Sequence, residues 1–167
     1  MADILNIVPS TTLLYLAALF VYTLCVKKLT AFSFIFVGVL ILEILHVGLE
    51  FYLYSSNEYS SYYELVYYSW YIGFAATDFL FIWVACLWSR KAQVPFDTIS
   101  KVVLWLHGFM GVIQIVRLVE RSYIDSYLMS LMYSNSIVLI NMIIALLLIG
   151  FVAKVILENL RQSFRSL

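Results

Sequence analysis

The sequence predicts an all-α, polytopic integral membrane protein: a helical bundle of about five transmembrane helices, with its N-terminus outside and its C-terminus inside. Of the 167 residues, 64% are hydrophobic and only 12% are charged, roughly half the charged share of a soluble domain. Five apolar stretches reach the length of roughly 20 residues that a membrane-spanning helix needs. Basic residues gather almost entirely on one side of these stretches, and this bias predicts the orientation.

The predicted spans follow one another with short connections, so we expect a single transmembrane domain over residues 1–167. The first span opens at Pro9 and Ser10, two residue types that are favoured at helix starts. Before the fourth span, Asp97 and Ser100 are candidate helix caps. The five spans are approximately residues 8–26, 29–54, 62–88, 100–120 and 127–153.

The distribution of basic residues predicts which side of the membrane each end occupies. Only Arg117 and Arg121 fall on one side, whereas eight basic residues fall on the other: Lys27, Lys28, Arg90, Lys91, Lys101, Lys154, Arg161 and Arg165. Because the cytoplasmic side carries the excess of Lys and Arg, we expect these eight residues to face the cytoplasm. We expect the chain to be a multi-pass protein of a bacterial inner membrane. Residues 154–167 then form a basic cytoplasmic amphipathic tail, which either lies on anionic lipid or simply extends the fifth helix.

Aromatic side chains crowd the outer ends of the second and third spans. Tyrosine and tryptophan prefer the headgroup level of a bilayer, so an aromatic belt is the default interpretation. The alternative is a ring-lined outer vestibule that binds a ligand. Its candidate residues are Tyr67, Trp70 and Tyr71.

Ionisable and amide side chains at membrane depth are the strongest candidates for function. Each buried ionisable group costs roughly 2.5–3.5 kcal/mol on insertion scales, so it needs a partner or water. Three of them on the second span share one helical face within an arc of roughly 60°. The predicted network comprises Glu43, His46, Glu50, Asp78, His107, Gln114, Arg117, Glu120 and Asn141.

The rise of 1.5 Å per helical residue gives each of these groups an approximate depth. Glu50 and Arg117 fall toward the outside at similar depth, so we expect them to pair. Asp78 and His107 fall slightly toward the inside, so we expect a second pair there. Glu43 and His46 lie between the two pairs.

Two interpretations of this network compete. In the first, the polar groups are interhelical contacts that fix helix register. In the second, which we favour, they line a water-accessible route, because packing alone could use Ser, Asn and Gln at lower cost. The leading hypothesis is therefore a small channel or transport subunit for protons, cations or a small solute. The lipid bilayer is its environment, and a homo-oligomer or a membrane partner subunit would complete the route.

Other function classes have weaker support. A membrane-embedded sensor or regulatory subunit that binds a partner protein is the main alternative. A redox or metalloprotein is third, because Glu43 and His46 have the spacing used in di-iron bundles, but the sequence holds only one such copy. We expect no cofactor, and no catalytic motif suggests an enzyme. No basic surface suggests a nucleic-acid partner, and Cys25 and Cys86 are interpreted as packing residues.

Overall fold

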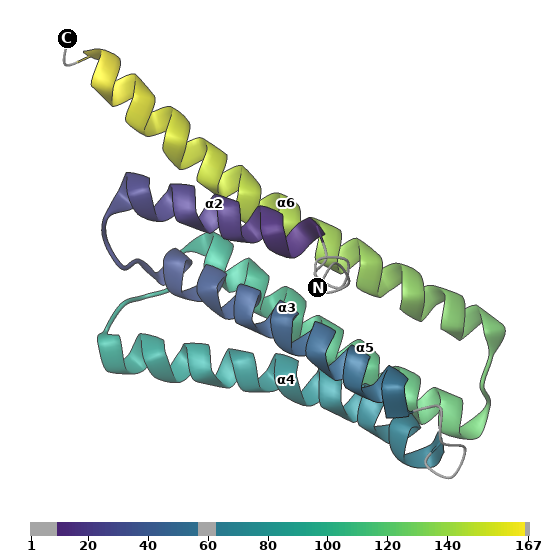
Figure 1. Cartoon of the computed structure of the whole chain (residues 1–167). Coiled ribbons are helices and arrows are strands. Elements are labelled where there is room, and N and C mark those ends of the chain that lie inside the picture. Colours follow the sequence, from purple (N-terminus) through teal and green to yellow (C-terminus); the bar gives the residue numbers. More distant parts are fainter. Residues whose placement is uncertain (1–9, 57–62, 166–167) are drawn as a thin grey trace.

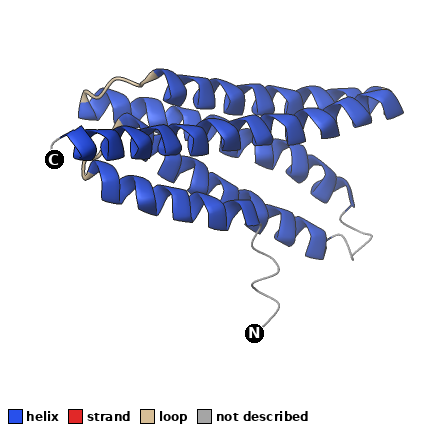
Figure 2. Cartoon of the chain, turned by 90° about the horizontal axis from the view of Figure 1, so that it is seen from above, coloured by secondary structure: helices blue, strands red, loops and turns tan. Residues whose placement is uncertain are grey.

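The computed structural model describes residues 10–56 and 63–165. Over these residues the chain forms helices joined by short turns, and no strand (Figure 2). The helices are α2 (Ser10–Val26), α3 (Ala31–Ser56), α4 (Tyr63–Ala92), α5 (Thr98–Tyr123) and α6 (Tyr127–Arg165). The predicted all-α bundle is confirmed.

Four of these helices, α3 to α6, are long and apolar enough to cross a membrane. The fifth, α2, is shorter: its 17 described residues rise about 25 Å, near the lower limit for a span. The chain is therefore a multi-pass membrane protein. The largest difference from the predicted spans is in α6, whose 39 residues run without interruption to Arg165. Residues 154–165 continue this helix, in agreement with the alternative that they extend the fifth helix.

The helices run along a common direction, with α4 and α6 on opposite sides of the bundle (Figure 1). Helix α5 packs against both α4 and α6, whereas α3 packs against α4, and α2 packs against α3 and α6. We call the end with the α2–α3 and α4–α5 connections the Lys27 end. The opposite end, with the α5–α6 connection, is the Arg117 end. The two ends differ in how they are packed.

The half of the bundle toward the Lys27 end has a densely packed apolar core. Phe32, Phe36 and Ile35 are almost fully buried there, together with Val103 and Leu148. The Phe32 ring lies 5.6 Å from that of Phe36, centroid to centroid. Such interiors exclude water because few gaps reach the size of a water molecule. Among the described residues, this half therefore offers no continuous polar route across the bundle.

The predicted cap of the fourth span is confirmed at the start of α5. Asp97 accepts a hydrogen bond of 2.9 Å from the backbone N–H of Ser100. It also accepts one of 2.7 Å from the Ser100 hydroxyl. An N-cap carboxylate satisfies helix donors that would otherwise lack partners. At the start of α3 the capping contacts are reciprocal: the backbone N–H of Thr30 donates to the Ser33 hydroxyl, and the backbone N–H of Ser33 donates to the Thr30 hydroxyl.

A close contact between α3 and α4 yields a stability prediction. A Cβ added at Gly38 would overlap Cε2 of Phe81, and Phe81 is itself buried against the His107 ring. Because the Phe81 ring has little room to move, Gly38→Ala is expected to destabilise the fold by about 1–3 kcal/mol. Unfolding in mixed detergent micelles measures the change. Gly150→Ala is the control, since nothing lies within 4 Å of its added Cβ; equal effects of the two substitutions would contradict the prediction.

The predicted orientation is tested with reporters. A reporter fused after Leu167 should be cytoplasmic, because the basic residues near that end are retained inside. A reporter inserted within residues 57–62 should be external. Accessibility of the two reporters to a membrane-impermeant reagent provides the measurement. If both reporters were found on the same side, one of the three helices between them, α4, α5 or α6, would not cross the membrane.

Candidate functional site

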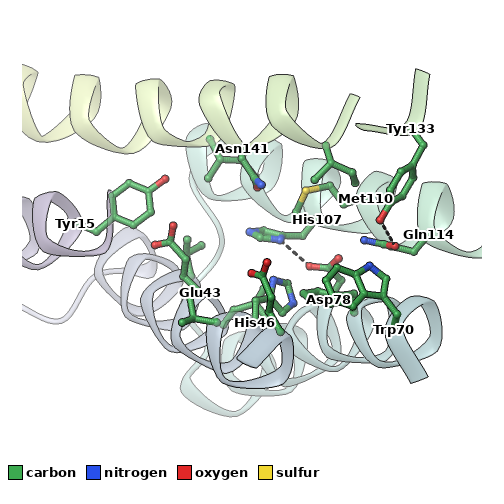
Figure 3. Close-up of a pocket in the computed structure, with 17 residues that line it drawn as sticks. Tyr15, Glu43, His46, Trp70, Asp78, His107, Met110, Gln114, Tyr133 and Asn141 are labelled. Atoms are coloured by element: carbon green, nitrogen blue, oxygen red, sulfur yellow. Dashed lines mark hydrogen bonds and ion pairs between the residues drawn. The ribbon is translucent and has the colours of Figure 1, made fainter. Parts of the chain in front are cut away.

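All five helices contribute to a cavity of about 280 Å³ near the middle of the bundle, which we call the central cavity. Figure 3 shows α6 on one side and α3 and α4 on the other, with Tyr15 of α2 at one edge. The cavity brings together seven residues of the predicted network from four helices. They are Glu43, His46, Glu50, Asp78, His107, Gln114 and Asn141.

Asp78 and His107 form the most deeply buried polar contact of the cavity, and the predicted pair is confirmed. Asp78 is only 1% exposed, and His107 is 4% exposed. His107 Nδ1 lies 2.9 Å from Asp78 Oδ1. The other ring nitrogen, Nε2, is buried without a hydrogen-bond partner among the described residues. In Figure 3 it turns away from Asp78, toward the part of the cavity where Glu43 lies.

This geometry leaves His107 Nε2 available to a hydrogen-bond donor in the cavity. With Asp78 ionised, Nδ1–H donates to the carboxylate, which fixes the tautomer and the ring orientation. The opposite nitrogen then carries a lone pair that can accept a proton or a hydrogen bond. A buried acceptor that lacks a partner costs about 1–3 kcal/mol. A donor in the cavity would remove that cost.

His46 is held by a second polar contact on the α3–α4 side of the cavity. Its Nε2 lies 2.8 Å from Thr77 Oγ1. The Thr77 hydroxyl is also 2.9 Å from the Phe74 carbonyl oxygen and 3.0 Å from that of Gly73. Since a hydroxyl has a single proton, donation to either carbonyl requires that His46 Nε2 be the donor to Thr77. The His46 lone pair is then on Nδ1.

The remaining lining combines acids with aromatic rings. On α3, Glu43 is half-buried, whereas Glu50 is exposed at the rim. Trp70 and Phe74 line the cavity from α4. On α6, the Tyr133 hydroxyl donates a 2.8 Å hydrogen bond to Gln114 Oε1 (Figure 3). The described lining residues include three carboxyl groups and two imidazoles but no Lys or Arg. The charge of this lining is therefore negative when the carboxyls are ionised and the imidazoles neutral.

The predicted pairing of Glu50 with Arg117 is wrong. Arg117 is buried at the Arg117 end, where it forms an ion pair with Glu120 three residues along α5. Its other terminal nitrogen lies 3.0 Å from Asp125 Oδ1. Glu120 also accepts a 2.7 Å hydrogen bond from the backbone N–H of Ser126. Arg117 and Glu120 therefore belong to a cluster that holds the α5–α6 turn and do not line the central cavity.

The three aromatic residues of the predicted vestibule do not all line one cavity. Trp70 lines the central cavity. Tyr67 and Tyr71 instead contact Arg121: its guanidinium lies 4.8 Å from the Tyr67 ring centroid and donates a 3.2 Å hydrogen bond to the Tyr71 hydroxyl. Such contacts attract and orient the Arg121 cation. The two tyrosines support the α5–α6 turn cluster.

The candidate metal ligands, Glu43 and His46, both line the cavity. Within residues 10–56 and 63–165, however, no three His, Cys, Asp or Glu side chains gather as a metal site would require. Stable protein metal sites generally need three or more ligands. Cys25 and Cys86 are free thiols.

Sequence reasoning missed two residues of the site. Tyr133 could have been found, because it shares one face of α6 with Ile137, Asn141 and Ile144 at helical spacing. Thr77 carried no comparable signal, since a threonine next to Asp78 commonly bonds its own helix. Its role depends on how α3 and α4 pack.

Comparisons of the chain with protein-family models, with curated proteins and with solved structures found no match.

Proposed function

We propose that this protein is a small membrane transport subunit that binds a small organic cation in the central cavity. Binding is coupled to protonation of the Asp78–His107 pair. The observation that carries the proposal is the buried His107 ring, oriented by Asp78 at 2.9 Å with its other nitrogen unpartnered among the described residues. A protonated amine offers that nitrogen a hydrogen-bond donor.

The rest of the lining supports a cationic ligand. Glu43 and Glu50 provide carboxylates, and Trp70 and Phe74 provide ring faces, which attract an ammonium group through cation–π contact. A cavity of about 280 Å³ is near the lower limit of typical ligand sites. It suits a compact amine better than a large substrate.

Charge predicts how the cation and the proton interact. Protonating the Asp78–His107 pair adds one positive charge beside the binding site, so it disfavours the bound cation. By linkage, cation binding then releases a proton, and affinity falls as the pH is lowered. A subunit of this kind exchanges protons for cations.

The predicted topology places the Glu50 rim on the outer side of a bacterial inner membrane. Because the Lys27 end is packed with apolar side chains, transport requires the helices to move or a second subunit to complete the route. Both a homo-oligomer and a heteromeric partner satisfy that requirement. An open channel through a single chain fits the packing less well.

The test uses three compounds of similar shape and different charge with the purified protein in nanodiscs. 2-Phenylethylammonium is expected to bind and to release protons, measured by calorimetry in buffers of different ionisation enthalpy. 2-Phenylethanol should bind at least roughly tenfold more weakly, because it lacks the charge–charge and cation–π terms. Phenylacetate should not bind. Equal binding of all three, or preference for the anion, would contradict the proposal. Uptake of the bound amine into proteoliposomes then distinguishes transport from binding alone.

A membrane sensor that acts on a partner protein is the second candidate. The observation that favours it is the unbroken course of α6 from the cavity residue Tyr133 to Arg165. Figure 1 shows its C-terminal part extending beyond the other helices. Two results together would favour this function: amine binding without amine flux, and capture of a specific partner protein through the C-terminal part of α6.

A further inference from the structure

A second, apolar groove lies on the outer surface of the bundle between α4 and α5, away from the central cavity. It has a volume of about 520 Å³, and we call it the α4–α5 groove. Among the described residues that line it, the one charged residue is Lys101, in the first turn of α5. The other lining residues are Phe79, Ile82, Cys86, Phe96, Leu104, Trp105, Gly108, Phe109 and Val112.

The groove matches one leaflet of a bilayer in length. From Lys101 to Val112 along α5 the rise is about 17 Å, roughly half of the 30 Å hydrocarbon thickness. Lys101 lies at the Lys27 end, at the depth expected for headgroups, and the apolar lining continues toward mid-membrane. Trp105 is 80% exposed, so it presents its ring to whatever fills the surrounding space.

The charge at the end of the groove selects among lipids. Lys101 is exposed, and α4 ends at the same side of the bundle with two more exposed cations, Arg90 and Lys91. A neighbouring groove between α3 and α4, of about 370 Å³, has no charged residue in the described part of its lining. Apolar grooves alone would accept any lipid, whereas a cation at headgroup level favours an anionic one.

We propose that the α4–α5 groove binds one anionic phospholipid. Its phosphate contacts Lys101, and one acyl chain lies along the groove toward Val112. The predicted topology places Lys101 in the cytoplasmic leaflet, where anionic lipids provide the negative surface potential. This site is independent of the central cavity and of the transport proposal.

Gly108 keeps the groove open at its middle. A Cβ added there would already lie 3.3 Å from Cδ1 of Ile82. A larger side chain at this position would occupy the acyl-chain path. Removing the charge and filling the path are therefore two separate ways to weaken the site.

The experiment measures lipid retention by native mass spectrometry after purification from vesicles of equal phosphatidylglycerol and phosphatidylcholine content. We expect the protein to retain phosphatidylglycerol about fivefold over phosphatidylcholine. Lys101→Gln should reduce this ratio to near one, and Lys101→Arg should keep it. Lys154→Gln, which removes another exposed cation at the same end of the bundle, is the matched control and should also keep the ratio.

The steric test is Gly108→Leu, which should lower retention of both lipids while the α3–α4 groove stays unchanged. Its folding is checked by the unfolding midpoint in detergent. Equal retention of the two lipids by the unmodified protein, or a ratio unaffected by Lys101→Gln, would overturn the proposal. Because retention is measured without any amine, the result is separate from the outcome of the cation-binding test.

Discussion

Asp78→Asn is expected to abolish proton release on cation binding and to weaken binding of 2-phenylethylammonium by at least roughly tenfold. The substitution keeps the shape of the side chain and can still accept a hydrogen bond from His107 Nδ1, which lies 2.9 Å from Asp78 Oδ1. It removes the negative charge and the titration. Calorimetry on the purified variant in nanodiscs measures both the affinity and the proton count.

Glu50→Gln is the matched control for this experiment. It removes a carboxylate of the same cavity at an exposed position on the rim, where water screens the charge. The affinity of this variant for 2-phenylethylammonium should therefore fall less than that of Asp78→Asn, and proton release should persist. If Asp78→Asn kept full affinity and proton release, Asp78 would be a packing residue. If the Asp78→Asn variant failed to assemble, the main role of Asp78 would be to join α4 to α5.

Arg117→Gln is expected to destabilise the fold by about 3–5 kcal/mol, because it leaves a buried carboxylate without its partner. The side chains of Arg117 and Glu120 are only 6% and 11% exposed. Glu120 also holds the backbone N–H of Ser126 at 2.7 Å, so the loss extends into the α5–α6 turn. Unfolding in mixed detergent micelles measures the change. Lys154→Gln, at an exposed ion pair on α6, should stay within about 0.5 kcal/mol.

A double-mutant cycle identifies the partner of Arg117. Arg117→Gln with Glu120→Gln should be milder than Arg117→Gln alone, because no buried charge is then unpaired. The cycle with Glu50→Gln should be additive, since Glu50 lies on the rim of the cavity and Arg117 in the turn cluster. Additive losses for Glu120, or strong coupling for Glu50, would contradict the arrangement of the α5–α6 turn.

The depth of each polar residue could be predicted from sequence because a helix has a fixed rise. That reasoning placed Asp78 level with His107, and the structure confirms the contact. The same reasoning failed for Arg117, because similar depth does not distinguish a facing helix from the residue's own turn. Glu120 is three residues away on the same helix, and Asp125 follows in the turn with a φ of 48°. Short-range partners of this kind need no helix packing to meet.

The shape of the central cavity was beyond sequence reasoning. Its walls depend on how far α6 lies from α3 and on where α2 begins beside them (Figure 1), and neither quantity follows from hydrophobic periodicity. The densely packed apolar core toward the Lys27 end could not be predicted either, because Phe32 and Phe36 do not differ in sequence from apolar residues that face lipid.

The length of α6 has a mechanical consequence. Its 39 residues form a rod of about 58 Å, nearly twice the hydrocarbon thickness. Tyr133, Ile137 and Asn141 place its first half against the cavity. Its second half runs past the end of α2, where Asn159 Nδ2 lies 3.4 Å from the Cys25 carbonyl oxygen, before it reaches Arg161. If the rod pivots near the cavity and stays straight, a tilt of about 10° moves its far end by roughly 5 Å. A small change in cavity volume would thus be amplified into a displacement at the membrane surface large enough for another protein to detect.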